Sequence, residues 1–189
     1  MNPIKLSLLQ QQLEGVAEVM GTALSRSAFS PNIRVRLDFS CALFNSSGDL
    51  LAQAAHIPVH LGSMSAAIRT VIAQVGEDVA PGDAYMLNSP FNGGTHLPDV
   101  TVVTPVFVDG RAAFWLGSRG HHADIGGRTP GSGPPDSTRI DEEGVVIDLV
   151  QLVSEGRFLE ERAREILASG PYPARQPDQN IADLKAQVA

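Results

Sequence analysis

The chain has a single cysteine and few cationic residues, and both shortages exclude classes of protein. Cys41 is the only cysteine among 189 residues, which excludes an internal disulfide framework and a cysteine-rich zinc module. Lys and Arg total 14 against 21 Asp and Glu, so the formal net charge is −7. We therefore expect neither nucleic acid nor an anionic membrane surface as the main partner.

Long apolar runs and nucleotide-binding loops are also missing. The longest uncharged run, residues 50–68, is broken by proline, glycine and polar residues, so we expect no membrane span. The N-terminal segment lacks the pattern of a signal peptide, and we expect a cytoplasmic protein. The chain has no glycine-rich phosphate loop and no Gly-x-Ser-x-Gly nucleophile elbow. We therefore expect that it does not bind ATP through a known loop.

Hydrophobic periodicity predicts an α+β fold, built as one domain over residues 1–189. Apolar residues from Leu6 to Leu24 recur every three or four positions, which is typical of a helix that packs on one side. Between Ile33 and Leu43 the period is two, which predicts a half-buried strand. Further strands are predicted at 50–55, 84–87 and 145–153, and further helices at 63–75, 158–168 and 181–188. We expect a mixed or antiparallel sheet with packing helices.

A predicted β-hairpin organises the candidate site. Two apolar runs flank Asp109-Gly110, and such a dipeptide between apolar runs is the strongest short-range signal for a hairpin. With these two residues as the turn, regular antiparallel pairing puts Asp99 opposite Gly120. The loop before the first strand and the loop after the second strand therefore emerge at the same end of the hairpin.

The loops at that end carry five side chains that suit a metal centre, namely His96, Asp99, His121, His122 and Asp124. Imidazole nitrogens together with carboxylate oxygens suit Zn, Mn or Fe(II). Two histidines and one carboxylate leave coordination positions open, as catalysis requires. From the pattern alone, a set of hydrogen-bonded loop residues without a metal is an equally good interpretation.

Four other residues have ordinary interpretations. Asp38 lies in the predicted strand, where an outer-face charge paired with a neighbouring arginine is favoured over a ligand. Cys41 lies on the apolar side of that strand and is predicted to be a small core residue. For His56 and His60, one packed and one exposed imidazole is favoured over a second metal site.

Four stretches together give the chain a family resemblance: RLDFSCALF at 36–44, HIPVHLGSM at 56–64, GGTHLPDV at 93–100 and GHHADIGG at 120–127. With them the sequence resembles the hydantoinase B/oxoprolinase family. That family includes the B subunits of ATP-dependent hydantoinases, 5-oxoprolinases, caprolactamase and the large subunits of acetone and acetophenone carboxylases. The resemblance covers essentially the whole chain. Because family members are considerably longer, it implies the N-terminal portion of the usual subunit.

The resemblance implies a divalent metal held by four side chains, Asp38, His96, Asp99 and His121. It thereby favours Asp38 as a ligand. The implied function is the metal-binding portion of an ATP-dependent cyclic amide hydrolase, in which a metal-activated water or a polarised amide takes part in ring opening. His122 or Asp124 is then expected to transfer a proton or to orient a ligand.

The resemblance also implies a partner. A hydantoinase A-type subunit binds ATP and activates the small cyclic amide substrate by phosphorylation, so a hetero-oligomer is expected. This division of labour agrees with the missing phosphate loop. Two alternatives stay open: a ketone carboxylase subunit of the acetone or acetophenone carboxylase type, and a non-catalytic assembly module.

Overall fold

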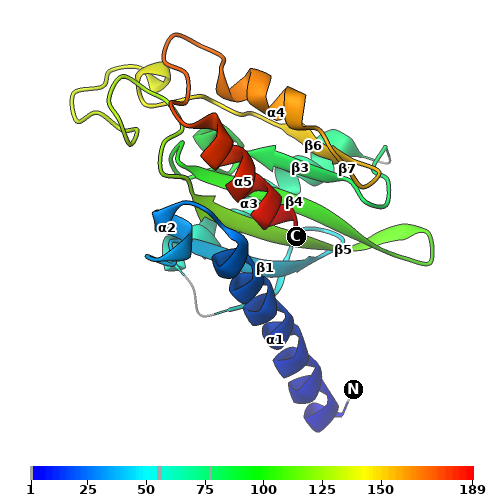
Figure 1. Ribbon diagram of the computed structural model, residues 1–189. Helices are drawn as coiled ribbons and strands as arrows, with labels where there is room; N and C mark the ends of the chain where they lie inside the picture. The colour runs from blue at the N-terminus through cyan, green and yellow to red at the C-terminus, as the bar shows by residue number, and fades with distance from the viewer. Residues whose placement is uncertain (1, 55–56, 77) are drawn as a thin grey trace.

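The computed structural model describes residues 2–54, 57–76 and 78–189 and shows an open antiparallel sheet with helices on both faces (Figure 1). Its seven strands run in the order β2-β1-β5-β4-β3-β6-β7, and every neighbouring pair is antiparallel. The strands are β1 Phe39–Asn45, β2 Leu50–Gln53, β3 Ala84–Leu87, β4 Asp99–Val108, β5 Arg111–His121, β6 Val150–Ser154 and β7 Arg157–Phe158. The predicted α+β class is confirmed.

The helices form one layer on each side of the sheet. They are α1 Pro3–Ser27, α2 Pro31–Arg34, α3 Pro58–Val75, α4 Glu160–Leu167 and α5 Pro177–Val188, with short 3-10 helices η1 Pro90–Asn92 and η2 Ile140–Glu142. Helix α3 packs on one face, whereas α1, α4 and α5 cover the other. Because both faces are covered, the central strands bury nearly all their side chains, as in β1.

The alternation of side chains along β1 divides the core into two layers. Phe44 packs with Met64 and Ile68 of α3 on one face. Cys41 points to the other face and joins Leu24 of α1. The predicted core role of Cys41 is therefore confirmed, and burial raises the pKa of its thiol to about 12, so it stays protonated and poorly nucleophilic.

Helix α1 confirms the predicted N-terminal helix and extends it in both directions. The Asn2 side chain accepts a hydrogen bond from the amide of Ile4 at 2.9 Å, which caps the first turn. The second half of the helix packs on the sheet through Ala17 and Leu24, while its first turns project beyond the sheet (Figure 1). Among the described residues, no helix is both long and apolar enough to cross a membrane.

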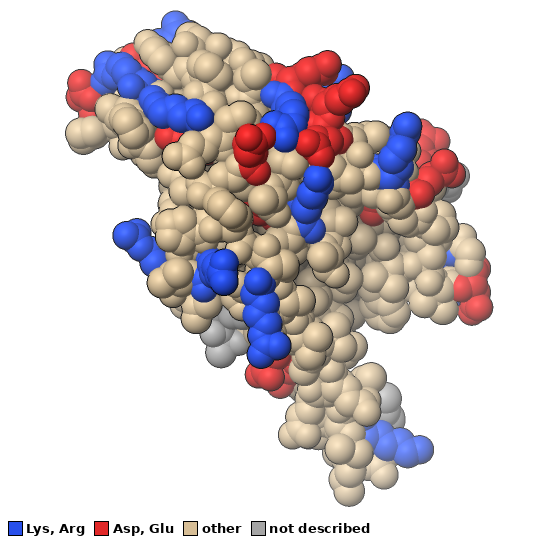
Figure 2. All heavy atoms as spheres, viewed as in Figure 1, with Lys and Arg blue, Asp and Glu red and all other residues tan. Residues whose placement is uncertain are grey.

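Ion pairs join α4 to α5 on the surface. Glu160 accepts from Arg164 at 2.8 Å and from Lys185 at 2.7 Å, and Arg164 also reaches Asp178 at 2.6 Å. Figure 2 shows cationic and anionic side chains interspersed on this side of the molecule. Exposed pairs of this kind contribute little individually, so the apolar contacts beneath them hold the two helices in place.

The prediction of a strand from Ile33 to Leu43 was wrong for its first half. Pro31 begins the short helix α2, and the preceding amides of Phe29 and Ser30 donate to Asp183 Oδ1 at 2.7 and 3.0 Å. Leu37 then adopts a left-handed conformation with φ of 56°, which stops regular pairing. The strand starts only at Phe39, so Asp38 lies in the loop just before β1.

Other predicted elements are present with different ends. Helix α3 starts at Pro58 rather than at residue 63, and β6 starts at Val150 rather than at 145. Helices α4 and α5 correspond to the predicted segments 158–168 and 181–188. Strand β2 matches the return strand as far as Gln53, and the last predicted residue of that strand lies outside the described residues.

The predicted hairpin is confirmed, but its register is shifted near the turn. Asp109 and Gly110 both have positive φ, as the tight hairpin turn requires. A bulge near the turn leaves Ala113 as an extra residue in β5. Asp99 therefore pairs with His121 and not with Gly120. This shift matters because directly opposed residues have side chains on the same face of the sheet.

Candidate metal centre

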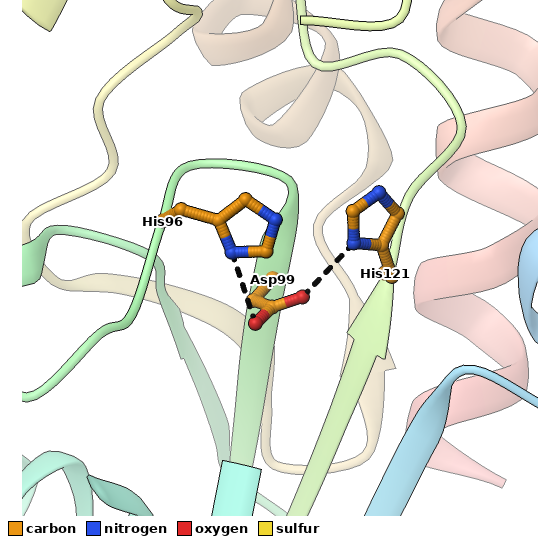
Figure 3. Close-up of side chains that lie close together, drawn as sticks. All are labelled: His96, Asp99 and His121. Carbon is orange, nitrogen blue, oxygen red and sulfur yellow. Dashed lines mark hydrogen bonds and ion pairs between the residues drawn. The ribbon is translucent and has the colours of Figure 1, made fainter. Parts of the chain in front are cut away.

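A buried carboxylate, Asp99, lies at the centre of the candidate site (Figure 3). Its side chain is 1% exposed; Oδ1 lies 3.2 Å from His121 Nδ1 and Oδ2 lies 3.1 Å from His96 Nδ1. One ligand atom from each of these three residues can be chosen so that all lie within 4.8 Å of one another. The structure thus brings together three of the residues that the sequence predicted, at the hairpin end where they were expected.

Two strands and one loop hold these three side chains. Asp99 begins β4 and His121 ends β5, and they are direct cross-strand partners. His96 comes from the loop before β4, where its carbonyl accepts a hydrogen bond from the amide of Asp99 at 3.0 Å. This backbone bond turns the loop so that His96 and Asp99 lie on the same side.

Two glycines allow the loop to pack this closely. Gly93 has φ of 85°, and a Cβ there would lie 2.3 Å from the backbone nitrogen of Ala67 in α3. A Cβ on Gly94 would lie 2.2 Å from the carbonyl oxygen of Asn88. Neither site has room for a side chain, so Gly93-Gly94 is a structural requirement for the position of His96.

His60 also belongs to the cluster, although the sequence pattern did not predict it at this site. It lies in the first turn of α3, is 2% exposed, and has Nε2 3.1 Å from Asp99 Oδ2. Its Nδ1 lies 3.3 Å from Ser40 Oγ. The predicted packed imidazole is therefore also a direct partner of the central carboxylate. His56, its counterpart in that prediction, lies outside the described residues.

Asp38 borders the cluster from the loop before β1. Its Oδ2 lies 3.8 Å from His121 Nδ1, and its Oδ1 lies 3.7 Å from His60 Nε2. Its side chain is 35% exposed. Within the described part of the chain, the ion pairs of Asp38 are with these two histidines and not with a neighbouring arginine, so the outer-face interpretation was wrong. Asp38 lies beside the group formed by His96, Asp99 and His121, and its role as a ligand stays a prediction from the family resemblance.

The electrostatics of the cluster favour a charged carboxylate at its centre. Burial raises the pKa of Asp99, but hydrogen bonds from His121, His60 and His96 and from the hydroxyl of Thr95 outweigh it and hold the pKa far below its usual range. The hydrogen bond to Asp99 raises the pKa of His96. Asp99 is therefore an anion at all physiological pH values, which suits binding of a cation.

The structure does not bring His122 into this cluster, because successive residues of a strand point to opposite faces. His122 is fully buried beneath α5, where its Nε2–H donates to Gln187 Oε1 at 3.0 Å. The Asn180 amide donates to its Nδ1, also at 3.0 Å. Burial lowers the pKa of His122, so the ring is neutral. The expectation that it converges with His121 was wrong.

Asp124 is likewise held elsewhere, by the loop that follows β5. It accepts hydrogen bonds from the amides of Gly126 at 2.9 Å and Gly131 at 3.0 Å. The Arg175 guanidinium donates to it at 2.9 Å. All of these contacts tie the glycine- and proline-rich segment to the body of the protein. Asp124 was expected at the metal cluster, but its contacts are those of a loop anchor.

Comparison with known proteins identifies the family. The family model described as Hydantoinase B/oxoprolinase matches residues 2–189, and the chain belongs to this family. The chain is 47% identical to 5-oxoprolinase PfmaA of Pestalotiopsis fici, over 100% of this chain and 15% of that protein. It is 33% identical to caprolactamase subunit beta of Pseudomonas jessenii, over 98% of this chain and 31% of that protein.

Solved structures share the fold. The crystal structure of ATP-dependent caprolactamase from Pseudomonas jessenii superimposes with a TM-score of 0.86 at 32% identity, covering 99% of this chain and 32% of that one. The nucleotide-free structure of acetone carboxylase has a TM-score of 0.83 at 22% identity, covering 99% and 24%. The chain thus spans only about a sixth to a third of the length of these relatives.

Proposed function

We propose that the chain is the metal-binding portion of an ATP-dependent cyclic amide hydrolase and that it holds one divalent cation at Asp99. The observation that carries this proposal is the buried anionic carboxylate between two imidazoles on one hairpin end. Family membership supports the reaction class, because relatives are named 5-oxoprolinase and ATP-dependent caprolactamase.

The donor set fits a divalent transition metal. A tetrahedral ion with bonds of about 2.1 Å separates neighbouring ligand atoms by roughly 3.4 Å. The two imidazole nitrogens lie 3.1 and 3.2 Å from different oxygens of Asp99, and one ligand atom from each of the three residues lies within 4.8 Å of the others, so the side chains would have to draw closer around the ion. His96, Asp99 and His121 would hold the ion, and Asp38 would complete the set. Nitrogen and carboxylate ligands favour Zn, Mn or Fe(II).

A cation at this place would lower the pKa of a bound water and polarise a carbonyl group. The protein's own contribution is to fix the ligands and to leave one side accessible. Asp99 is buried, whereas the His96 side chain is 49% exposed and Asp38 is 35% exposed, so a substrate would approach from the side of these two residues. His60 donates a hydrogen bond to Asp99 Oδ2 from the buried side and orients that carboxylate.

His122 and Asp124 have a supporting part in this proposal. His122 follows His121 directly, and its two hydrogen bonds to α5 fix the end of β5. Asp124 anchors the loop that leaves the site. We assign positioning rather than proton transfer to both residues, because neither side chain is in contact with the cluster.

A partner subunit would bind ATP. The sequence has no phosphate loop, and the similar caprolactamase chain is named as a subunit beta. We infer a hetero-oligomer with a hydantoinase A-type subunit that phosphorylates the cyclic amide before ring opening. Reconstitution with such a subunit is expected to give ATP-dependent opening of a lactam such as 5-oxoproline. Assembly without turnover would favour the alternative of a non-catalytic module.

Metal analysis of the purified, tag-free protein tests the proposed site. After exposure to Zn²⁺ and removal of excess, the wild-type protein is expected to retain one equivalent. His96→Ala should retain much less, because it removes a ligand without touching the core. Phe91→Ala, which truncates a side chain that is 84% exposed near the same loop, is the matched control and should bind as the wild type does. Equal metal content in the wild type and His96→Ala contradicts the proposal.

A further inference from the structure

Arg119 is a fully buried cation next to the candidate metal centre. It is 0% exposed and is among the largest fully buried side chains of the residues that the structure describes. Within the described residues, no carboxylate lies within ion-pair distance of its guanidinium. Isolated buried charges are strongly unfavourable, and an apolar side chain of similar volume would avoid that cost. The contacts of the guanidinium must therefore offset the cost of burying its charge.

The guanidinium hydrogen-bonds to three separate segments. Its Nε donates to Thr101 Oγ1 at 2.7 Å, which fixes the plane of the group against β4. Its Nη2 donates to the carbonyl oxygen of Gly93 at 2.9 Å. Its Nη1 donates to the carbonyl oxygen of His60 at 3.2 Å and also bonds Ser63 Oγ.

These acceptors lie in the segments that deliver the cluster's side chains. Gly93 begins the loop that carries His96, and His60 itself contacts Asp99. Arg119 and Thr101 are a cross-strand pair two residues along from the pair of Asp99 and His121, on the same face of the sheet. The guanidinium thus lies beside the cluster, two residues further along the hairpin, and donates hydrogen bonds to both the loop and α3.

We propose that Arg119 is a positioning residue that holds the His96 loop and the first turn of α3 against the hairpin, so that His96 and His60 reach Asp99. The inference rests on the proposed metal function, because metal binding is the reason why His96 must be placed accurately. A planar fork of five donors is needed to reach acceptors on three segments at once, and a lysine ammonium has the charge but not the span.

Arg119→Lys tests this inference because it keeps the charge and removes the fork. Two readouts are needed: the dissociation constant for Zn²⁺, and amide hydrogen exchange in the metal-free protein. We expect at least about tenfold weaker Zn²⁺ binding, the range seen when outer-shell partners of metal ligands are removed. We also expect faster exchange at the amides of Gly94 and Asp99, which bond within the loop, with unchanged exchange in β3. Arg69→Lys, at an exposed ion pair, is the matched control.

A double-mutant cycle separates positioning from general destabilisation. If Arg119 acts partly through the loop, Arg119→Lys should cost clearly less Zn²⁺ affinity in the His96→Ala background than in the wild type, because the loop then carries no ligand. An equal loss in both backgrounds overturns the inference. So does an Arg119→Lys protein with wild-type affinity and wild-type exchange.

A second variant keeps the test decisive where Arg119→Lys does not fold. Thr101→Val removes only the acceptor of Nε and is expected to speed exchange at Gly94 in the same direction but by less; unchanged exchange there contradicts the inference. If the wild-type protein binds no metal, the proposed function fails. The exchange measurement still decides whether Arg119 holds the loop.

Discussion

Asp99 and His121 are direct cross-strand partners at the open end of the β4–β5 hairpin, with Oδ1 and Nδ1 3.2 Å apart. The pair exists because a bulge near the hairpin turn shifts the register by one residue. Without that shift, His121 would be offset from Asp99 by one position along the strand. The strand pairing therefore places an imidazole beside the buried carboxylate before the loop histidine or any ion is considered.

Asp99→Asn is expected to abolish metal binding, because it removes the central anionic ligand and leaves an uncharged amide among three imidazoles. Zn²⁺ affinity should fall by more than about 100-fold, which exceeds the effect of losing an outer-shell partner. Isothermal titration measures it. Asp136→Asn makes the same chemical change at a side chain that is 76% exposed and should bind as the wild type does. Comparable affinities for the two variants would contradict the assignment.

Asp38→Asn tests the ligand that the family resemblance implied. We expect it to weaken Zn²⁺ binding while leaving the melting temperature of the metal-free protein nearly unchanged. The Asp38 side chain is partly exposed and lies as far as 3.7 and 3.8 Å from its histidine partners, so these ion pairs contribute little to stability. Thermal unfolding with and without metal checks both statements. An unchanged affinity would leave Asp38 as a bordering charge only.

The sequence predicted much of this site but not all of it. Periodicity and the Asp109-Gly110 turn were enough to bring His96, Asp99 and His121 to one place, because a hairpin fixes which loops share an end. The same reasoning failed for His122, because alternation along the strand sends adjacent residues to opposite faces. Convergence at one end of a hairpin does not establish a shared face.

The parts that were missed depend on tertiary packing. His60 reaches Asp99 only because α3 crosses the sheet with its first turn over the hairpin end, and no local pattern encodes that crossing. No sequence pattern singled out Arg119, because its burial and its hydrogen bonds depend on the loop and the helix α3 that pack against it. The alternation from Ile33 to Leu37 is typical of a strand, but Pro31 and the hydrogen bonds that the preceding amides donate to Asp183 favour a helical turn.

Acid should destabilise the metal-free protein through His122. Burial lowers the pKa of this histidine in the folded state below the unfolded value of about 6.5, so the unfolded chain binds the extra proton. Its contribution therefore reduces stability as pH falls below about 6.5, by at most about 1.4 kcal/mol per pH unit. Urea unfolding between pH 7.5 and about 5 measures this slope.

The matched variant is His122→Gln, which cannot be protonated. We expect a lower stability at neutral pH, because the bonds to Asn180 and Gln187 are perturbed, but a flatter decline towards acid. His96 acts in the opposite direction, since its raised pKa stabilises the fold below the unfolded value and that contribution is lost as pH rises. An identical acid slope in His122→Gln and the wild type would contradict the neutral, buried assignment.

Gly94→Ala should displace the loop that carries His96. The new Cβ would lie 2.2 Å from the Asn88 carbonyl oxygen, a backbone atom that cannot move cheaply. We expect a loss of about 1–3 kcal/mol in stability, typical of overpacking, together with weaker Zn²⁺ binding. Gly15→Ala, in a helix with nothing within 4 Å of the new Cβ, should instead stabilise the protein by up to about 1 kcal/mol. Unfolding curves and metal titrations of the two variants check both predictions.

The most direct test of the central claim is a crystal structure of the metal-soaked protein with diffraction data collected on both sides of the metal absorption edge. The proposal predicts one strong anomalous peak between His96 Nδ1, His121 Nδ1 and the carboxylate of Asp99. Saturating metal with no peak at that position, or with a peak only at surface carboxylates, would contradict it.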